Sequence, residues 1–222
     1  MSAARVGMVH TVPALVDSFD ELFQRRMPGA AVLHIVDAEL LATAIRVGVT
    51  ADVQRRLTAH VQHFAGAGCR AVLVTCSSIG ETVATAARAV GIPVVRVDDP
   101  MSGDAVNLAK AGGGRSHIVV LATLEATLGP SLRLIESKAR GSQVTVSSRL
   151  IAGAATARAS GDQGLHDKLI AAAVRNEVGR AGVVALAQAS MADAAATIST
   201  TVPILTSPVG AVSALARLAS GE

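Results

Sequence analysis

The chain has 222 residues, of which 50% are hydrophobic and 17% are charged, and its formal net charge is +3. This composition excludes a disordered chain, and no apolar run approaches the ~18 residues of a membrane-spanning helix. With no Trp, no Tyr and three Phe, the sequence lacks the aromatic residues on which single-stranded nucleic acid stacks. We therefore expect no membrane and no nucleic-acid partner.

The N-terminus and the cysteine content indicate a cytoplasmic protein. Residues 1–10 lead straight into an apolar strand, without the apolar region of a signal peptide. Two cysteines, Cys69 and Cys76, do not make a disulfide framework in a chain of this length. A reducing cytoplasm is the compartment that fits both observations.

Apolar runs alternate with helical segments along the first half of the chain. In chain order, we expect a strand over 5–10, a helix over 13–27, a strand over 31–36, and helices over 39–47 and 50–66. A strand over 71–74, a helix over 78–90 and a strand over 93–97 complete this half. The alternation predicts parallel βαβ units and a sheet that is covered on both faces.

The second half follows the same order after a predicted boundary at Asp98-Asp99-Pro100. Helices are expected over 100–111, 124–140 and 162–179, with a last helix from Pro208, and strands over 117–122, 143–150, from Val184, and over 203–206. The alanine-rich segment 153–161 has no clear pattern and is left unassigned. We expect the last helix to pack back on the first lobe.

The stretch AVLVTCSSIGE, residues 71–81, is the most informative part of the first half. Its apolar run is typical of a strand that is buried on both faces, and Ser78 with Glu81 has the spacing of a capping box that starts a helix. Cys76 lies between the end of this strand and the start of the helix, where free backbone N–H groups and the helix dipole favour a thiolate. A buried structural cysteine is the alternative. Cys69 precedes the strand and is expected only to fill space.

An internal repeat at an offset of 112 residues relates the two halves. The offset carries Cys76 to Gln188, Ser78 to Ser190 and Thr11 to Thr123. Such a duplication predicts an α/β fold of two pseudo-symmetric lobes, each with a four-stranded, mainly parallel sheet flanked by helices, and a site in the cleft between them. The first lobe would comprise residues 1–98 with 208–222, and the second lobe residues 99–207.

Motifs for bound nucleotides and metals are absent from the sequence. It contains no Walker loop and no GxGxxG after a strand, and its six histidines lack zinc spacing. His60 and His63 are interpreted as surface residues without carboxylate partners. We therefore expect neither a metal nor any other cofactor. Hydroxyls and free N–H groups at the four corners, at Thr11, 76–78, Thr123 and 188–190, would suit a carboxylate, although each hydroxyl alone is more often a helix cap.

Three segments, VTCSSIGE, LAQASMAD and GDQGLHD, resemble the aspartate/glutamate/hydantoin racemase superfamily, and the likeness covers essentially the whole chain. The resemblance implies two pseudo-symmetric α/β lobes and a site that needs no cofactor. Cys76-Ser77-Ser78 matches the first catalytic corner of that family, and Gln188 stands where hydantoin-type members have a second cysteine. Thr11 and Thr123 match positions that bind polar groups of the substrate, and His10 takes the place of an acidic residue of glutamate-type members.

The glutamine changes the chemistry that the resemblance implies. Racemisation needs one group that removes a proton and another that returns it on the opposite face, and a glutamine amide does neither near neutral pH. We expect a cofactor-independent racemase or isomerase that acts beside a carboxylate or carbonyl of an amino acid, hydantoin or dicarboxylate. A single-cysteine decarboxylase acting on malonates and a non-catalytic binding protein remain alternatives.

The roles expected of the individual residues follow from this hypothesis. Cys76 is the acid, base or nucleophile, and His166, at the start of the helix over 162–179, is a candidate second proton carrier or simply an early-helix residue. The residues expected to bind the substrate are His10, Thr11, Ser77, Ser78, Thr123, Gln188, Ala189 and Ser190. The expected partner is a small substrate with a carboxylate or carbonyl group, and we also expect a homo-oligomer.

Overall fold

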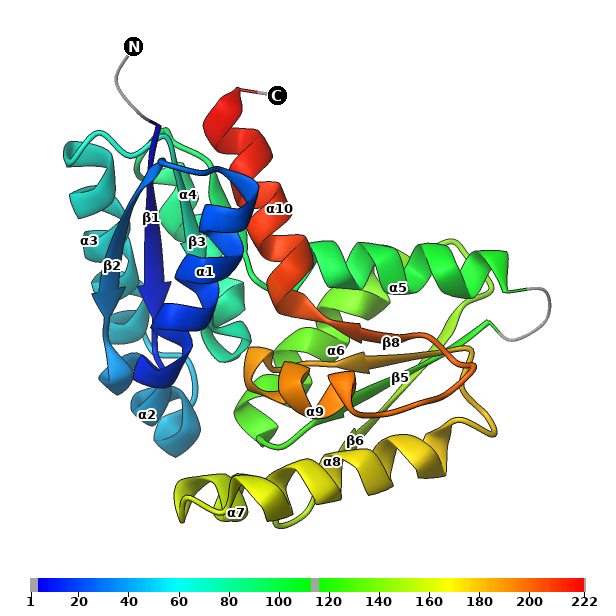
Figure 1. The fold of residues 1–222 in the computed structure, drawn as a ribbon. Helices are drawn as coiled ribbons and strands as arrows, with labels where there is room; N and C mark the ends of the chain where they lie inside the picture. The colour runs from blue at the N-terminus through cyan, green and yellow to red at the C-terminus, as the bar shows by residue number, and fades with distance from the viewer. Residues whose placement is uncertain (1–3, 113–115, 222) are drawn as a thin grey trace. The chain divides into compact units, whose positions relative to one another are not determined.

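The computed structural model describes residues 4–112 and 116–221. The chain divides into two compact units, unit 1 with Met1–Val97 and Pro208–Glu222, and unit 2 with Asp98–Ser207. Each unit is built on its own four-stranded parallel sheet (Figure 1). The predicted α/β class is therefore confirmed, and both sheets are parallel throughout. None of the described helices is long and apolar enough to cross a membrane.

Unit 1 contains four strands in the order β2-β1-β3-β4. Its elements are β1 (Arg5–His10), η1 (Pro13–Leu15), α1 (Val16–Arg26), β2 (Ala31–Val36), α2 (Ala38–Val47), α3 (Ala51–Gly66), β3 (Ala71–Val74), η2 (Ser77–Thr82), α4 (Val83–Arg88), β4 (Val94–Arg96) and α10 (Ser207–Ser220). Every residue of the apolar run in β3 is buried, as expected for a central parallel strand.

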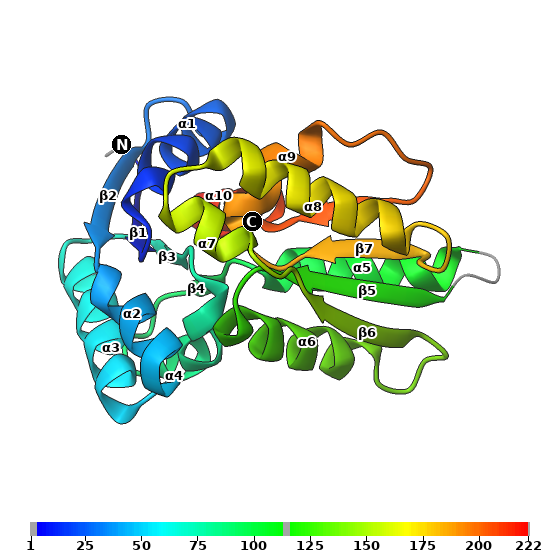
Figure 2. The same cartoon turned by 90° about the horizontal axis from the view of Figure 1, so that it is seen from below.

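Helices cover both faces of this sheet (Figure 2). Apolar side chains of α2, α3 and α4 form one core with Val9, Val72 and Val74, whereas α1 lies over the opposite face and brings Phe19 against His10. The close approach of α3 explains a glycine in β1, since a Cβ atom on Gly7 would collide with the ring of Phe64.

Unit 2 repeats the arrangement with the strand order β6-β5-β7-β8. Its elements are α5 (Asp99–Ala111), β5 (His117–Ala122), α6 (Glu125–Ala139), β6 (Thr145–Leu150), α7 (Ala154–Ala159), α8 (Gln163–Glu177), β7 (Val183–Leu186), η3 (Ala189–Met191), α9 (Ala192–Ala196) and β8 (Ile204–Thr206). Helices α5 and α6 pack on one face, and α7, α8 and α9 pack on the other. The register repeats as well, because Val6 pairs with Ala71 and Ile118 with Val183 at the same offset.

The structure corrects the predicted start of the helix after β3. The helix after β3 begins at Ser77 rather than Ser78, has 3-10 geometry, and has Cys76 as its N-cap residue. The helix after β7 likewise begins at Ala189, with Gln188 as its N-cap. Both helices open with a 3-10 turn, which is tighter than an α-helix. The N-cap residues are therefore Cys76 and Gln188, the two residues of the predicted site.

Candidate functional site

The first corner is formed where β1 and β3 end side by side. These strands are parallel neighbours in which Val9 pairs with Val74. Continuing this register two residues past the pair brings Thr11 level with Cys76, and the hydroxyl of Thr11 is one of the groups that lower the pKa of the thiol. Cys76 is 7% exposed and Thr11 is 4% exposed, so both residues are buried. Ser77 and Ser78, which follow in η2, are also buried.

Burial decides the charge of the Cys76 thiol. Loss of water raises its pKa, and this effect outweighs the hydroxyl of Thr11 and the backbone amides of Ser78 and Ile79, which lower it. The predicted thiolate with a lowered pKa is therefore wrong for the unliganded protein. One short 3-10 turn supplies too few donors to offset complete desolvation, and the side chain is a neutral thiol near pH 7.

The second corner has the same geometry with a different side chain. Oε1 of Gln188 accepts hydrogen bonds from the backbone N–H of Thr123 at 2.6 Å and from its hydroxyl at 3.0 Å. Because a backbone N–H can only donate, the atom facing it must be the amide oxygen, which directs Nε2 away from Thr123. Within the described ranges, Nε2 of Gln188 has no hydrogen-bond partner, so it is available as a donor.

The same arrangement therefore occurs in both corners, at positions that differ by the offset of the repeat. A threonine after the first strand of each sheet faces the residue that caps the turn after the third strand. Thr11 lowers the pKa of Cys76 in unit 1, and Thr123 hydrogen-bonds Gln188 in unit 2. Ala189 is buried and Ser190 is half-buried beside Gln188. The structure brings Thr11, 76–78 together in unit 1 and Thr123, 188–190 together in unit 2. The predicted cleft between the lobes stays a prediction.

His166 is fully buried in unit 2 and is half satisfied. Its Nδ1 donates to the carbonyl of Ala154 at 2.9 Å, and its Nε2 has no hydrogen-bond partner among the described residues. Ala154 opens α7 just after β6, and the N–H of Ile151 still bonds the carbonyl of Ala122 at the end of β5. His166 thus lies near the carboxyl edge of the sheet, on the same edge as Thr123, with an unpaired lone pair on Nε2.

His10 has a different place from the one predicted for a residue that touches substrate. It is completely buried, and both ring nitrogens have protein neighbours, Thr75 Oγ1 at 3.1 Å and His34 Nδ1 at 3.0 Å. Burial, followed by the charge of His34, lowers the pKa of His10 to about 4. His10 is therefore a neutral residue behind the corner, on the opposite face of the sheet from Cys76.

Arg96, which lies near this edge, was not identified from the sequence, and the interpretation of His60 needs correction. Arg96 ends β4, and its guanidinium passes over Gly80 of η2 so closely that a Cβ atom there would collide with it. The sequence feature that could have identified Arg96 is its charge at the end of the otherwise apolar strand β4. His60, which was interpreted as having no carboxylate partner, bonds Asp37 at 2.8 Å, and Arg56 bonds the same carboxylate. That interpretation is wrong.

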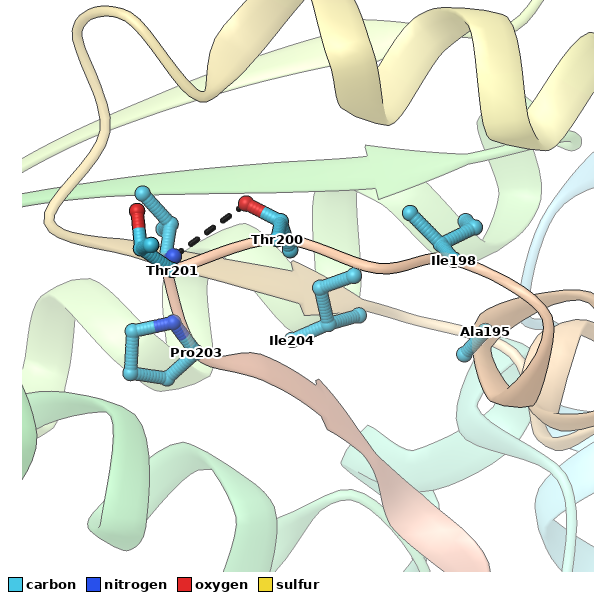
Figure 3. A pocket seen from close by; sticks show the side chains of 7 residues that line it. Ala195, Ile198, Thr200, Thr201, Pro203 and Ile204 are labelled. Atoms are coloured by element: carbon cyan, nitrogen blue, oxygen red, sulfur yellow. Dashed lines mark hydrogen bonds between the residues drawn. The ribbon is translucent and has the colours of Figure 1, made fainter.

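A hollow in unit 2 lies at the opposite edge of its sheet. A pocket of about 300 Å³ is formed by the loop between α9 and β8, which enters β8 at its amino end (Figure 3). Its lining residues are Ala195, Ile198, Thr200, Thr201, Val202, Pro203 and Ile204. The hydroxyl of Thr200 accepts from the Val202 N–H there, and no candidate catalytic residue lines the pocket. In the described part of the chain, no three His, Cys, Asp or Glu residues are grouped to hold a metal.

Solved structures with the same fold include several racemases and a decarboxylase. Aspartate racemase from Picrophilus torridus has a TM-score of 0.74 at 13% identity, with 98% of this chain and 95% of that chain covered. Allantoin racemase from Klebsiella pneumoniae has a TM-score of 0.70 at 14% identity, covering 99% and 89%. Arylmalonate decarboxylase has a TM-score of 0.54 at 13% identity, covering 98% and 93%. No curated protein matches the chain.

The fold and the repeated corners define a class of α/β proteins with two similar sheets and paired capping residues at their carboxyl edges. The model of the Asp/Glu/hydantoin racemase family matches residues 7–218, and the chain belongs to this family. Membership of the family and the racemases among the structural neighbours support a racemase-type function.

Proposed function

We propose that the protein is a cofactor-independent isomerase of the racemase type, acting on a carbon next to a carboxylate or carbonyl of a small amino acid, hydantoin or dicarboxylate. The observation that carries the proposal is the repeated corner, in which a threonine holds Cys76 in one unit and Gln188 in the other. Because the repeat relates these positions, the two corners would serve one substrate.

The first corner would provide the proton chemistry. The thiol of Cys76 would first give its proton to solvent water. The thiolate would then remove the proton from the substrate carbon, and the electron pair of that C–H bond would move into an enolate. Backbone amides and hydroxyls of Ser77 and Ser78 would stabilise the carboxylate or the developing enolate oxygen.

The second corner would bind and orient the substrate. Thr123 occupies the oxygen of the Gln188 amide, so Nε2 can donate to a substrate oxygen. Ala189 and Ser190 would add an N–H and a hydroxyl. Since no group of this corner titrates near neutral pH, the proton that completes racemisation needs another carrier. The unpaired Nε2 of buried His166 is our candidate.

A second function, decarboxylation of a malonate, is favoured by one observation. Cys76 is held as a neutral thiol, which is the form that protonates an enolate. In that reaction the C–C bond to one carboxylate breaks, CO2 leaves, and the electron pair forms the enolate. The thiol then donates its proton to the carbon and regains one from water, so a single proton carrier is sufficient.

Incubation in D2O with NMR detection separates these functions. We would test amino acids, hydantoins and substituted malonates with the wild type, with Cys76→Ser and with Cys69→Ser as the matched cysteine control. Deuterium in recovered substrate indicates racemisation, and deuterium in a decarboxylated product indicates the lyase. Cys76→Ser should lose several orders of magnitude in turnover, since a hydroxyl is a far weaker acid and nucleophile, while Cys69→Ser should stay near wild type. Ordinary turnover by Cys76→Ser would refute the proposed role of this residue.

A further inference from the structure

Two buried polar residues directly precede the residues of the first corner. His10 comes before Thr11 at the end of β1, and Thr75 comes before Cys76 after β3. Because side chains alternate along extended chain, His10 and Thr75 lie on one face of the sheet while Thr11 and Cys76 lie on the other. The same two backbone segments thus carry a polar contact on each face.

On the face of the sheet opposite Cys76, Thr75 contacts both the backbone of Val9 and the ring of His10. Both the backbone N–H and the hydroxyl of Thr75 bond the carbonyl of Val9, at 3.0 and 3.1 Å. Oγ1 of Thr75 also lies 3.1 Å from Nδ1 of His10, and the tautomer of His10 sets which of these two atoms donates. Thr75 is 4% exposed and His10 is completely buried, so no water competes for the bond.

His10 is in turn held from two further elements. Its Nε2 lies 3.0 Å from Nδ1 of His34 in β2, and His34 reaches Asp20 of α1 at 3.3 Å. The backbone carbonyl of His10 accepts from the N–H of Asp37, after β2, at 2.8 Å. The His10 ring is therefore restrained by β2 and α1 before it contacts β3, and it can serve as a rigid reference for Thr75.

Unit 2 shows that a corner of this fold can close without such a pair. At the offset of the repeat, the positions of His10 and Thr75 are Ala122 and Ala187, and both alanines are completely buried. Thr123 nevertheless bonds Gln188 beside them. The polar pair accompanies only the corner with the cysteine, so the general architecture does not require it.

We propose that His10 and Thr75 form a positioning pair that holds the Thr11 hydroxyl against the Cys76 thiol. The contact between His10 and Thr75 fixes the position of the end of β1 relative to the end of β3. Because Thr11 and Cys76 are the next residues of these two segments, their relative position is fixed as well. His10 is then a positioning residue rather than a substrate ligand. The inference rests on the proposed function, in which Cys76 carries the proton, but its test does not require turnover.

The test follows the alkylation of Cys76 by iodoacetamide against pH in a Cys69→Ser background. Thr11→Val should raise the apparent pKa of Cys76, because it removes a hydrogen bond to the thiolate, and should slow alkylation at pH 8 roughly three- to tenfold. Thr75→Val should shift the profile in the same direction, and Thr75→Ser should restore it. The double variant Thr11→Val/Thr75→Val should match Thr11→Val alone, since both act through one contact.

Three results would overturn the proposal: a wild-type profile for Thr75→Val, an additive shift in the double variant, or no rescue by Thr75→Ser. Thr43→Val is the control, because it removes another buried hydroxyl of unit 1 that bonds only within its helix region. If Thr75→Val does not fold, Thr75→Ala takes its place, since alanine stands at the equivalent position of unit 2. If no substrate turns over while the thiol coupling is observed, the proposed function fails and the positioning pair stands.

Discussion

The buried histidine of the first corner makes a quantitative prediction about acid stability. The pKa of His10 is lowered to about 4 in the folded protein, from 6.5 for an ordinary histidine. Between these values the unfolded chain binds a proton that the folded chain does not, so stability is complete above pH 6.5 and is lost as the pH falls toward 4. At 1.36 kcal/mol for each pKa unit, the loss from this one residue amounts to about 3 kcal/mol.

The groups around His10 determine how the prediction is isolated. His34 of β2 is the ionisable group in contact with it, Asp20 of α1 lies beyond His34, and Thr75 of β3 and Phe19 of α1 are its neutral neighbours. His10→Asn retains an amide that can donate to or accept from Thr75 but cannot titrate. We expect this variant to have a lower free energy of unfolding than the wild type at pH 7.5. On acidification, its free energy of unfolding should fall less than that of the wild type.

Urea unfolding of the two proteins at several pH values provides the measurement. The free-energy difference between wild type and His10→Asn should shrink by about 3 kcal/mol between pH 7.5 and pH 4. His63→Asn, at an exposed position of α3, is the matched control for loss of a histidine. A difference between wild type and His10→Asn that is the same at every pH would refute the argument that His10 is buried in its neutral form.

Two substitutions in unit 2 test the remaining assignments. Gln188→Cys places a second thiol where Thr123 now bonds the amide, and it should gain or increase racemisation, measured by exchange and loss of optical rotation; unchanged rates would mean that the two corners do not serve one substrate. His166→Asn keeps a donor for the carbonyl of Ala154 but lacks the basic Nε2, so it should abolish racemisation while the circular dichroism spectrum is retained. Near-normal rates in this variant would make His166 a structural residue.

Local patterns were sufficient to predict most of the fold. The runs 5–10 and 71–74 became strands with the expected bounds, because the positions of a parallel strand that are buried on both faces are mostly apolar. The helix over 51–66 begins as predicted, with the Thr50 side chain accepting from the Val53 N–H. The segment 153–161 could not be assigned because its helix, α7, is only six residues long and follows a glycine with a φ of 77°.

The sequence by itself determined the repeat, the parallel sheets and the position of Cys76 at a strand end, since these depend on periodicity and spacing along the chain. Only the tertiary structure decided the charge of that thiol, the orientation of the Gln188 amide and the burial of His10. Each of these depends on groups that are distant in sequence, such as Thr11 beside Cys76, Thr123 beside Gln188 and His34 beside His10. Desolvation and hydrogen bonding add up over all neighbours in space, and a linear pattern cannot supply that sum.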